Sequence, residues 1–170
     1  ARGGLARLLP NGALDDSFLQ GWAGANRGAY TLALQRDGKV VIGGDLDTFN
    51  GIARKGIARV NADGALDESF APNLEGKARA VYSLALQNDG KILIGGSFTS
   101  VNGLARTNLA RLNPDGSSDS SFVGSVSSGS GDGVEVMVLQ PDGRIVIGGF
   151  FSVVNGVSRN RIARLHSDGS

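Results

Sequence analysis

The chain of 170 residues carries 17 Lys and Arg against 16 Asp and Glu, so its formal net charge is +1. This balance offers no basic surface to nucleic acid or to an anionic membrane. The sequence contains no cysteine, which excludes disulfides, thiolate metal sites and cysteine nucleophiles. No apolar run approaches the roughly 18 residues that a membrane-spanning helix needs. We therefore expect no nucleic-acid partner, no membrane insertion and no cofactor.

A partial repeat occupies residues 1–29. It contains a short apolar segment, Ala6-Arg-Leu8, a turn signal at Asn11-Gly12 and the segment Leu14–Phe18. Each of these features returns later in the chain, where it lies in the second half of a longer unit. The partial repeat is therefore predicted to be the third strand and the tail of an incomplete unit, followed by a connecting segment.

Residues 30–80 form the first full repeat, 81–135 form the second, and 136–170 form a third that lacks the tail. Four equivalent arginines are separated by 52, 52 and 53 positions: Arg7, Arg59, Arg111 and Arg164. A fixed period of this length indicates a repeat architecture, because each copy is one structural unit that packs on its neighbours.

Each full repeat begins with two predicted strands joined by a tight turn. In the second copy, Tyr82–Gln87 alternates large and small side chains, which is typical of a strand whose two faces have different neighbours. Lys91–Gly95 is apolar at consecutive positions and therefore fits a strand covered on both faces. Asp89-Gly90 separates them, and Asp-Gly between apolar runs is a strong hairpin signal because glycine reaches positive φ without strain.

The second half of each repeat adds a third strand and a tail. In the first full copy, Asn50-Gly51 precedes the third strand, Gly56–Val60, and an Asp63-Gly64 turn leads to the tail, Leu66–Phe70. A unit that is apolar on both faces needs another copy on each side. The pattern therefore predicts an all-β propeller built from four-stranded antiparallel blades of about 52 residues, with no helix.

The repeat resembles the delta-60-type β-propeller repeats of large, often secreted bacterial proteins. The resemblance lies in LALQ-x-DGK-x-x-IGG, NG-x-AR, ARLN-x-DG and LD-x-SF, and it covers nearly the whole chain. It implies a propeller blade and favours an extracellular or cell-surface location. The double glycines are placed as in kelch-like blades, although the kelch Tyr and Trp pattern is missing. A β-trefoil is the alternative fold, and the consecutive apolar residues of the second strand favour the propeller over it.

The repeated arginines of the third strand lie in an otherwise apolar segment. An anion-binding ring would explain them, but a residue present in every copy serves what every copy needs, and a buried guanidinium requires a carboxylate. The tails supply one carboxylate each. We therefore expect bidentate ion pairs inside or between blades. The residues involved are Arg59, Arg111, Arg164, Asp15, Asp67 and Asp119.

Few residues suit catalysis or a metal site. The single histidine, His166, occupies the turn position of Asn113, and one histidine without cysteine makes no multi-histidine or thiolate zinc site. Segment 113–122 lacks the final glutamate of an EF-hand loop. Asp45 and Asp47 occur in one copy only and form the best carboxylate pair for a glycan-active hydrolase. We expect a non-enzymatic protein.

The segments that join one repeat to the next differ in length and chemistry: 19–29, 71–80 and 123–135. In propellers such connections crowd one face, and a residue present once is free to serve a ligand. The only tryptophan, Trp22, lies in the first segment and either folds over its own loop or anchors a sugar or protein together with nearby amide and guanidinium groups. The candidate ligand-binding residues are Trp22, Asn26, Arg27, Asp45 and Asp47.

These features predict a binding or scaffolding module with a carbohydrate or protein ligand on the loop face. A glycan-active hydrolase and a structural spacer of a surface protein are the alternatives. The chain opens inside a repeat without an initiator methionine, so we expect a longer parent chain with further blades. For the chain alone we expect a homodimer that closes a six-bladed ring, because propellers have about 4 to 8 blades. Tail Leu14–Phe18 of one copy would then complete the last blade of the other.

Overall fold

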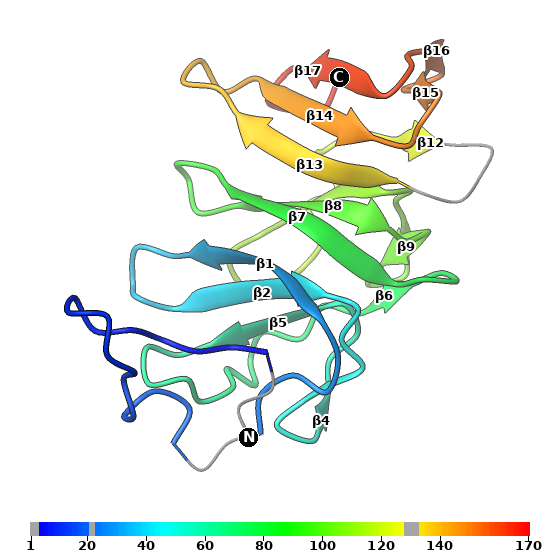
Figure 1. Cartoon of the computed structure of the whole chain (residues 1–170). Helices are drawn as coiled ribbons and strands as arrows, with labels where there is room; N and C mark the ends of the chain where they lie inside the picture. The colour runs from blue at the N-terminus through cyan, green and yellow to red at the C-terminus, as the bar shows by residue number, and fades with distance from the viewer. Residues whose placement is uncertain (1–3, 21–22, 128–132) are drawn as a thin grey trace.

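The computed structural model describes residues 4–20, 23–127 and 133–170, and these form only strands, turns and loops. Three antiparallel sheets repeat one topology, in which a first, a second and a third strand lie in that order. Figure 1 shows the sheets stacked one above another in chain order. Their strands are β1 Ala29–Leu34, β2 Val40–Gly44 and β5 Ile57–Val60; β7 Ala80–Leu86, β8 Ile92–Ser97 and β11 Leu109–Leu112; β13 Val134–Leu139, β14 Ile145–Gly149 and β17 Ile162–Leu165.

The Asp-Gly signals form the turns between the first two strands of each sheet. In the second sheet, Gly90 has a φ of +84° and its amide donates to Gln87 O at 3.0 Å, while Gln87 N donates to Lys91 O at 2.9 Å. The Asp89 carboxylate accepts the Lys91 amide at 3.1 Å. Because only glycine enters this backbone region without a steric penalty, the same dipeptide recurs at each turn.

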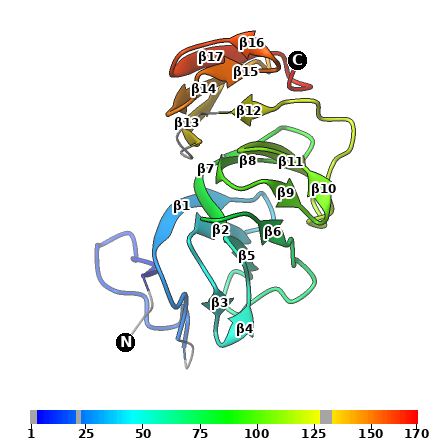
Figure 2. The same ribbon diagram turned by 90° about the vertical axis from the view of Figure 1, so that its right-hand side faces the viewer.

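Each Asn-Gly signal is the tip of a second, shorter hairpin. Asn102 and Gly103 have φ values of +52° and +76°, as a two-residue hairpin turn requires. The sequence predicts only a turn here, and it predicts loops for connecting segments that in fact pair with these hairpins. The additional strands are β3 Thr48–Phe49 and β4 Ile52–Ala53; β6 Leu74–Glu75, β9 Ser100–Val101 and β10 Leu104–Ala105; β12 Val126–Ser127, β15 Val153–Val154 and β16 Val157–Ser158. Figure 2 shows β1 and β7 on one side of the stack and β10 on the other.

The tail of each blade is shorter than predicted. Leu66 forms a single bridge to Val60, and the second blade has the same arrangement, so the fourth predicted strand is reduced to one residue. The aromatic residue of the tail packs instead on the Asp-Gly turn of the next blade. A Cβ added to Gly116 would lie 2.9 Å from the Phe70 ring. The tail therefore joins neighbouring blades rather than widening a sheet.

The hydrophobic core lies between the sheets. Every residue of β8 is buried, as its consecutive apolar side chains predict. The double glycines allow the sheets to approach each other, since a Cβ added to Gly95 would lie 2.6 Å from Val134 Cγ1 of the next sheet. Burial of these facing apolar surfaces is the main stabilising contribution to the stack.

The two outermost faces of the stack are exposed. On β1, Leu32 and Leu34 are 53% and 70% exposed, and on β13, Val136 and Val138 are each 61% exposed. The prediction of an all-β fold of repeated antiparallel units is confirmed. The part of the chain that the structure describes contains no helix long and apolar enough to cross a membrane.

Candidate functional site

The repeated arginines form an ion-pair layer inside the blades. Arg59 Nε lies 2.9 Å from Asp67 Oδ2, and Arg111 Nε lies 2.7 Å from Asp119 Oδ2. All four side chains are buried. Each guanidinium also covers an aromatic ring of its own tail, and the Arg59 guanidinium carbon lies 4.4 Å from the centre of the Phe70 ring. These contacts give the arginines a structural role.

The same guanidinium groups connect each blade to the next. Arg59 Nη1 donates to Pro114 O of the following blade at 2.6 Å, and Arg111 makes the matching bond at 2.7 Å. The partial repeat makes both kinds of contact through Arg7, whose Nε lies 2.7 Å from Asp15 Oδ2. The layer therefore stabilises the stack between blades as well as within them.

The aspartates of this layer are held in the charged form. Burial by itself raises the pKa of Asp67, but hydrogen bonds from Lys39 and Ser69 and the charge of Arg59 outweigh burial and hold that pKa well below its usual range. Asp119 has the matching set of partners, and its pKa is lowered in the same way. Folding therefore favours the ionised carboxylates.

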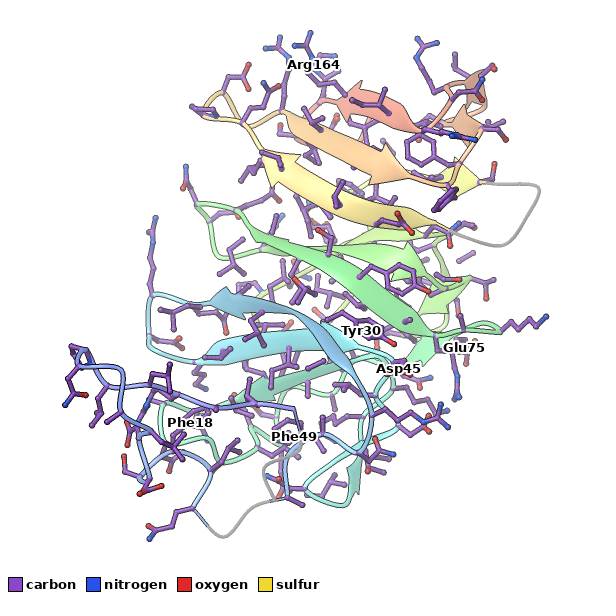
Figure 3. All side chains as sticks on the ribbon, in the orientation of Figure 1. Phe18, Tyr30, Asp45, Phe49, Glu75 and Arg164 are labelled. Atoms are coloured by element: carbon purple, nitrogen blue, oxygen red, sulfur yellow. The ribbon has the colours of Figure 1, made fainter. Side chains whose placement is uncertain are left out.

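The third blade lacks this ion pair. Arg164 is exposed, as Figure 3 shows, and it makes no salt bridge among the described residues. The described residues do not include the predicted partner of Arg164, since Asp119 follows Arg111 by eight positions and the equivalent position lies beyond residue 170.

At the far end of the first strands, away from the Asp-Gly turns, each sheet carries a β-bulge. The register shifts between Ala29 and Thr31 in β1 and at the same place in β7 and β13. The bulged residues are Tyr30, Tyr82 and Glu135. A bulge breaks the alternation of side chains and re-aims one of them. The ring centres of Tyr30 and Tyr82 lie 5.9 Å apart with an interplanar angle of 36°.

Asp45 follows β2 and lies beside Tyr30 in Figure 3. A Cβ added to Gly28 would lie 2.6 Å from the Tyr30 ring and 3.3 Å from Asp45 Oδ1, so both side chains close over the bare glycine. Burial raises the pKa of the Tyr30 hydroxyl, and the charge and hydrogen bond of Asp45 raise it further. Asp45 Oδ1 is buried and has no hydrogen-bond partner at normal distance among the described residues.

Asp47 lies between two arginines that precede the first strands of successive blades. Arg27 Nε is 2.8 Å from Asp47 Oδ2, and Arg79 Nη2 is 3.4 Å from Asp47 Oδ1. Asn26 Oδ1 accepts the amides of Asp47 and Thr48 at 3.1 and 2.9 Å and so fixes the loop that carries Asp47. We name the set Arg27, Tyr30, Asp45, Asp47, Arg79 and Tyr82 the bulge-end site.

The blade-building residues decide the family. The model of a family described as "Domain of unknown function (DUF5122) beta-propeller" matches residues 1–18, 35–70, 87–122 and 140–170, which is more than half of the chain. The chain belongs to the DUF5122 β-propeller family. This match confirms the propeller prediction and favours it over the trefoil. A search of curated proteins gave no match.

Most of the bulge-end site lies outside the segments that the DUF5122 β-propeller model matches. The unmatched segments between the matches are 19–34, 71–86 and 123–139, and they contain four of the six residues of the site. The Asp-Gly turns, the second and third strands and the ion-pair layer of the DUF5122 blade lie inside the matched segments. What the family model describes is therefore the blade, and the bulge end is where the copies differ.

The structure brings several of the predicted site residues of this DUF5122 protein together. Arg27 and Asp47 pair directly, Asn26 holds their loop, and Asp45 is two positions from Asp47 on the same loop. Trp22 lies outside the described residues. Sequence reasoning missed the aromatic part of the site and Arg79. The tyrosines at the equivalent positions 30 and 82 could have indicated this part of the site. In the alternating pattern of the DUF5122 repeat, however, they look like ordinary strand residues.

The opposite end of the DUF5122 blades has two hollows of about 450 Å³, each lying between the Asp-Gly turns of neighbouring blades. Gln35 lines one and Gln140 the other, and the Oε1 atom of each is buried without a partner among the described residues. Equivalent turn residues line both hollows. The described residues include no cluster of three or more His, Cys, Asp or Glu able to hold a metal ion.

Proposed function

We propose that this chain is a non-enzymatic binding module whose ligand, a carbohydrate or a protein, docks at the bulge-end site. One observation carries the proposal. The three copies share the residues that build the blade, yet the bulge carries tyrosine in two copies and Glu135 in the third, and the residue that follows the second strand differs in every copy: Asp45, Ser97 and Phe150. Exposed aromatic and charged groups gather there from two blades. Residues that are free of a blade-building role are available to recognise a ligand.

A glycan-active hydrolase that uses Asp45 and Asp47 is the alternative function. Glycoside hydrolysis needs one carboxyl group that donates a proton and one that acts as base or nucleophile. Both oxygens of Asp47 already contact guanidinium groups, at 2.8 and 3.4 Å. This occupancy favours binding over catalysis. Hydrolysis of a glycan by the wild-type chain, lost in Asp45→Asn, would establish the enzyme instead.

The resemblance to delta-60-type repeats, with glycines placed as in kelch-like blades, supports a role in a secreted or cell-surface bacterial protein. In that setting further blades of a longer chain, or a second copy of this one, complete the ring. A structural spacer is the remaining alternative, because a propeller segment without a ligand can still separate other domains.

Binding can be tested with a printed glycan array and a phage-displayed peptide library. The site variant is Arg27→Ala with Tyr30→Ala, and the matched control is Arg36→Ala with Asn88→Ala, which removes two exposed side chains at the turn end. We expect at least one probe that binds the wild type and the control but not the site variant. Identical binding profiles for all three proteins would favour the spacer.

A further inference from the structure

The exposed aromatic residue of the bulge-end site has the form of a stacking platform. Tyr30 is 53% exposed although it belongs to a strand, and it is outside the three buried apolar clusters. Tyr82 supports it from the neighbouring blade at 5.9 Å. Tyrosine combines a rigid apolar face with little conformational freedom to lose. A pyranose ring, whose C–H groups form an apolar face, fits such a platform.

The polar groups around the platform suit a ring of hydroxyl groups. Arg27 is 57% exposed and uses only Nε in its salt bridge, so the two terminal amino groups of its planar fork remain available within the described residues. Asp45 adds a half-buried carboxylate next to the Tyr30 ring; because its Oδ1 is buried, a sugar hydroxyl would bond to its Oδ2. Sugar hydroxyl groups can donate a hydrogen bond to the carboxylate and accept one from the guanidinium group, so one edge of a sugar ring can bind both side chains.

The third blade also carries an aromatic and an acidic residue at these two positions, but the acidic residue is at the bulge and the aromatic residue follows the second strand. Glu135 occupies the bulge position of Tyr30, and Phe150 occupies the position of Asp45 after the second strand. Phe150 is 48% exposed. The two positions adjoin, since a Cβ added to Gly149 would lie 2.8 Å from Glu135 N. The first and third blades therefore each carry an aromatic and an acidic residue at these two neighbouring positions, with Tyr82 of the second blade between them.

The charges of this surface select against anionic ligands. Arg27 and Arg79 both pair with Asp47, and Asp45 lies beside Tyr30, so the six residues of the bulge-end site carry no net charge. Farther along, Glu135 is accompanied by the exposed Arg161, whose amide donates to Phe151 O. A sulfated or sialylated glycan is favoured by a surplus of cationic side chains, which the bulge-end site does not have.

We propose that the bulge-end site binds a neutral oligosaccharide, with one sugar ring stacked on Tyr30 and hydrogen-bonded to Asp45 and Arg27, and with a second subsite at Glu135 and Phe150. This inference rests on the proposed function and names its ligand class. The chain of sugar rings runs across the first strands of the blades, past Tyr82.

The test compares variants on an array of neutral and anionic oligosaccharides, followed by titration calorimetry with the best neutral binder. We expect Tyr30→Ala to weaken binding by about tenfold or more, because it removes the stacking face. Tyr30→Phe retains that face and should stay within about threefold of the wild type. Asp45→Asn should weaken every neutral binder, and Phe150→Ala only the longer ones. Arg36→Ala is the control at the turn end.

The outcomes separate this inference from the proposed function. Binding of only anionic glycans or peptides that is lost in Tyr30→Ala leaves a binding module at this site and overturns the neutral oligosaccharide. Neutral glycan binding that is unchanged in both Tyr30→Ala and Asp45→Asn places the ligand elsewhere and overturns both. Absence of any binding overturns both as well. Thermal melts of each variant show whether a loss reflects unfolding, and Tyr30→Phe and Asp45→Asn keep the test valid if Tyr30→Ala is unstable.

Discussion

The guanidinium group of Arg111 is engaged on every side. Its Nε pairs with Asp119 at 2.7 Å, Nη2 donates to Ser121 Oγ at 3.2 Å, and Nη1 donates to Ser167 O at 2.7 Å. Its plane lies over the Phe122 ring, 5.0 Å from the centre. A charged group can be buried at a tolerable cost only when its donors are satisfied in this way. Arg111 thereby couples its own tail to the next blade.

Arg111→Ala should lower the free energy of unfolding by about 2–3 kcal/mol. The loss stays near the lower end for a broken buried pair because Lys91 Nζ, 2.8 Å from Asp119 Oδ2, still neutralises the carboxylate. Urea unfolding measures the change. Arg106→Ala is the matched control, since Arg106 is only half-buried and bonds only to backbone carbonyls. Equal losses for the two variants would show that the ion-pair layer adds nothing beyond surface contacts.

The stability of the fold should fall in acid. The pKa values of Asp67 and Asp119 are lowered on folding, so their contribution is fully present above the unfolded pKa of about 4 and is lost as the pH falls toward the folded values. We expect the free energy of unfolding to decline steadily from about pH 5 to pH 2. Asp119→Asn should reduce stability at pH 7 and flatten this decline. Parallel pH profiles for the wild type and Asp119→Asn would contradict the assignment.

Among the elements, the long strands follow from local sequence and the bulges do not. Strand β8 can be predicted from neighbouring positions alone, because its apolar residues are consecutive and an Asp-Gly turn precedes it. A bulge depends on which residue of β7 faces which residue of β8, so the sequence around Tyr82 contains no local signal that predicts it. The two-residue strands of the small hairpins are too short to show alternation. For this reason Asp45 and Arg27 were predictable as single-copy residues, whereas Tyr30 was hidden inside a strand pattern.

The double glycine at the end of β8 is required by backbone contact. A Cβ added to Gly96 would lie 2.0 Å from Ala80 O across the ladder, and neither strand can move without disturbing its pairing. Gly96→Ala should therefore cost about 3 kcal/mol or abolish soluble folding. Gly103→Ala is the control, because that site has open space and only its φ of +76° is unfavourable, a penalty of about 1 kcal/mol. Similar melting temperatures for the two variants would contradict the explanation that Gly96 is required by the close approach of β7 within the same sheet.

At the scale of the whole molecule, the two exposed faces are equivalent to the two faces that meet between neighbouring blades. The face of β1 with Leu32 and Leu34 corresponds to the face of β7 that packs toward β1. The face of β13 with Val136 and Val138 corresponds to the opposite face of β7, which packs toward β13. The chain therefore already contains, twice, the contact that these two faces would make with each other. Part of the β1 face is covered by Phe18 and the rest of the partial repeat.

We expect this 170-residue chain to form a head-to-tail dimer in which each open β13 face docks on the β1 face of the other copy, giving a closed ring of six blades. Burial of the exposed leucines and valines drives the association. Arg164 of one copy would then compete with Arg7 for Asp15 of the other, so residues 4–8 should become protease-sensitive in the dimer.

Light scattering after size-exclusion chromatography should report twice the chain mass of 17.4 kDa. Val138→Glu places a charge in the centre of the exposed β13 face and should return the chain to a monomer or to an aggregate, because an unpaired carboxylate cannot be buried between blades. Ile52→Glu, on the small hairpin of the first blade, changes another exposed apolar residue, 38% exposed and away from β13, and should remain dimeric. A folded wild-type monomer, or a filament that grows with concentration, would show that the two faces do not close on each other in this way.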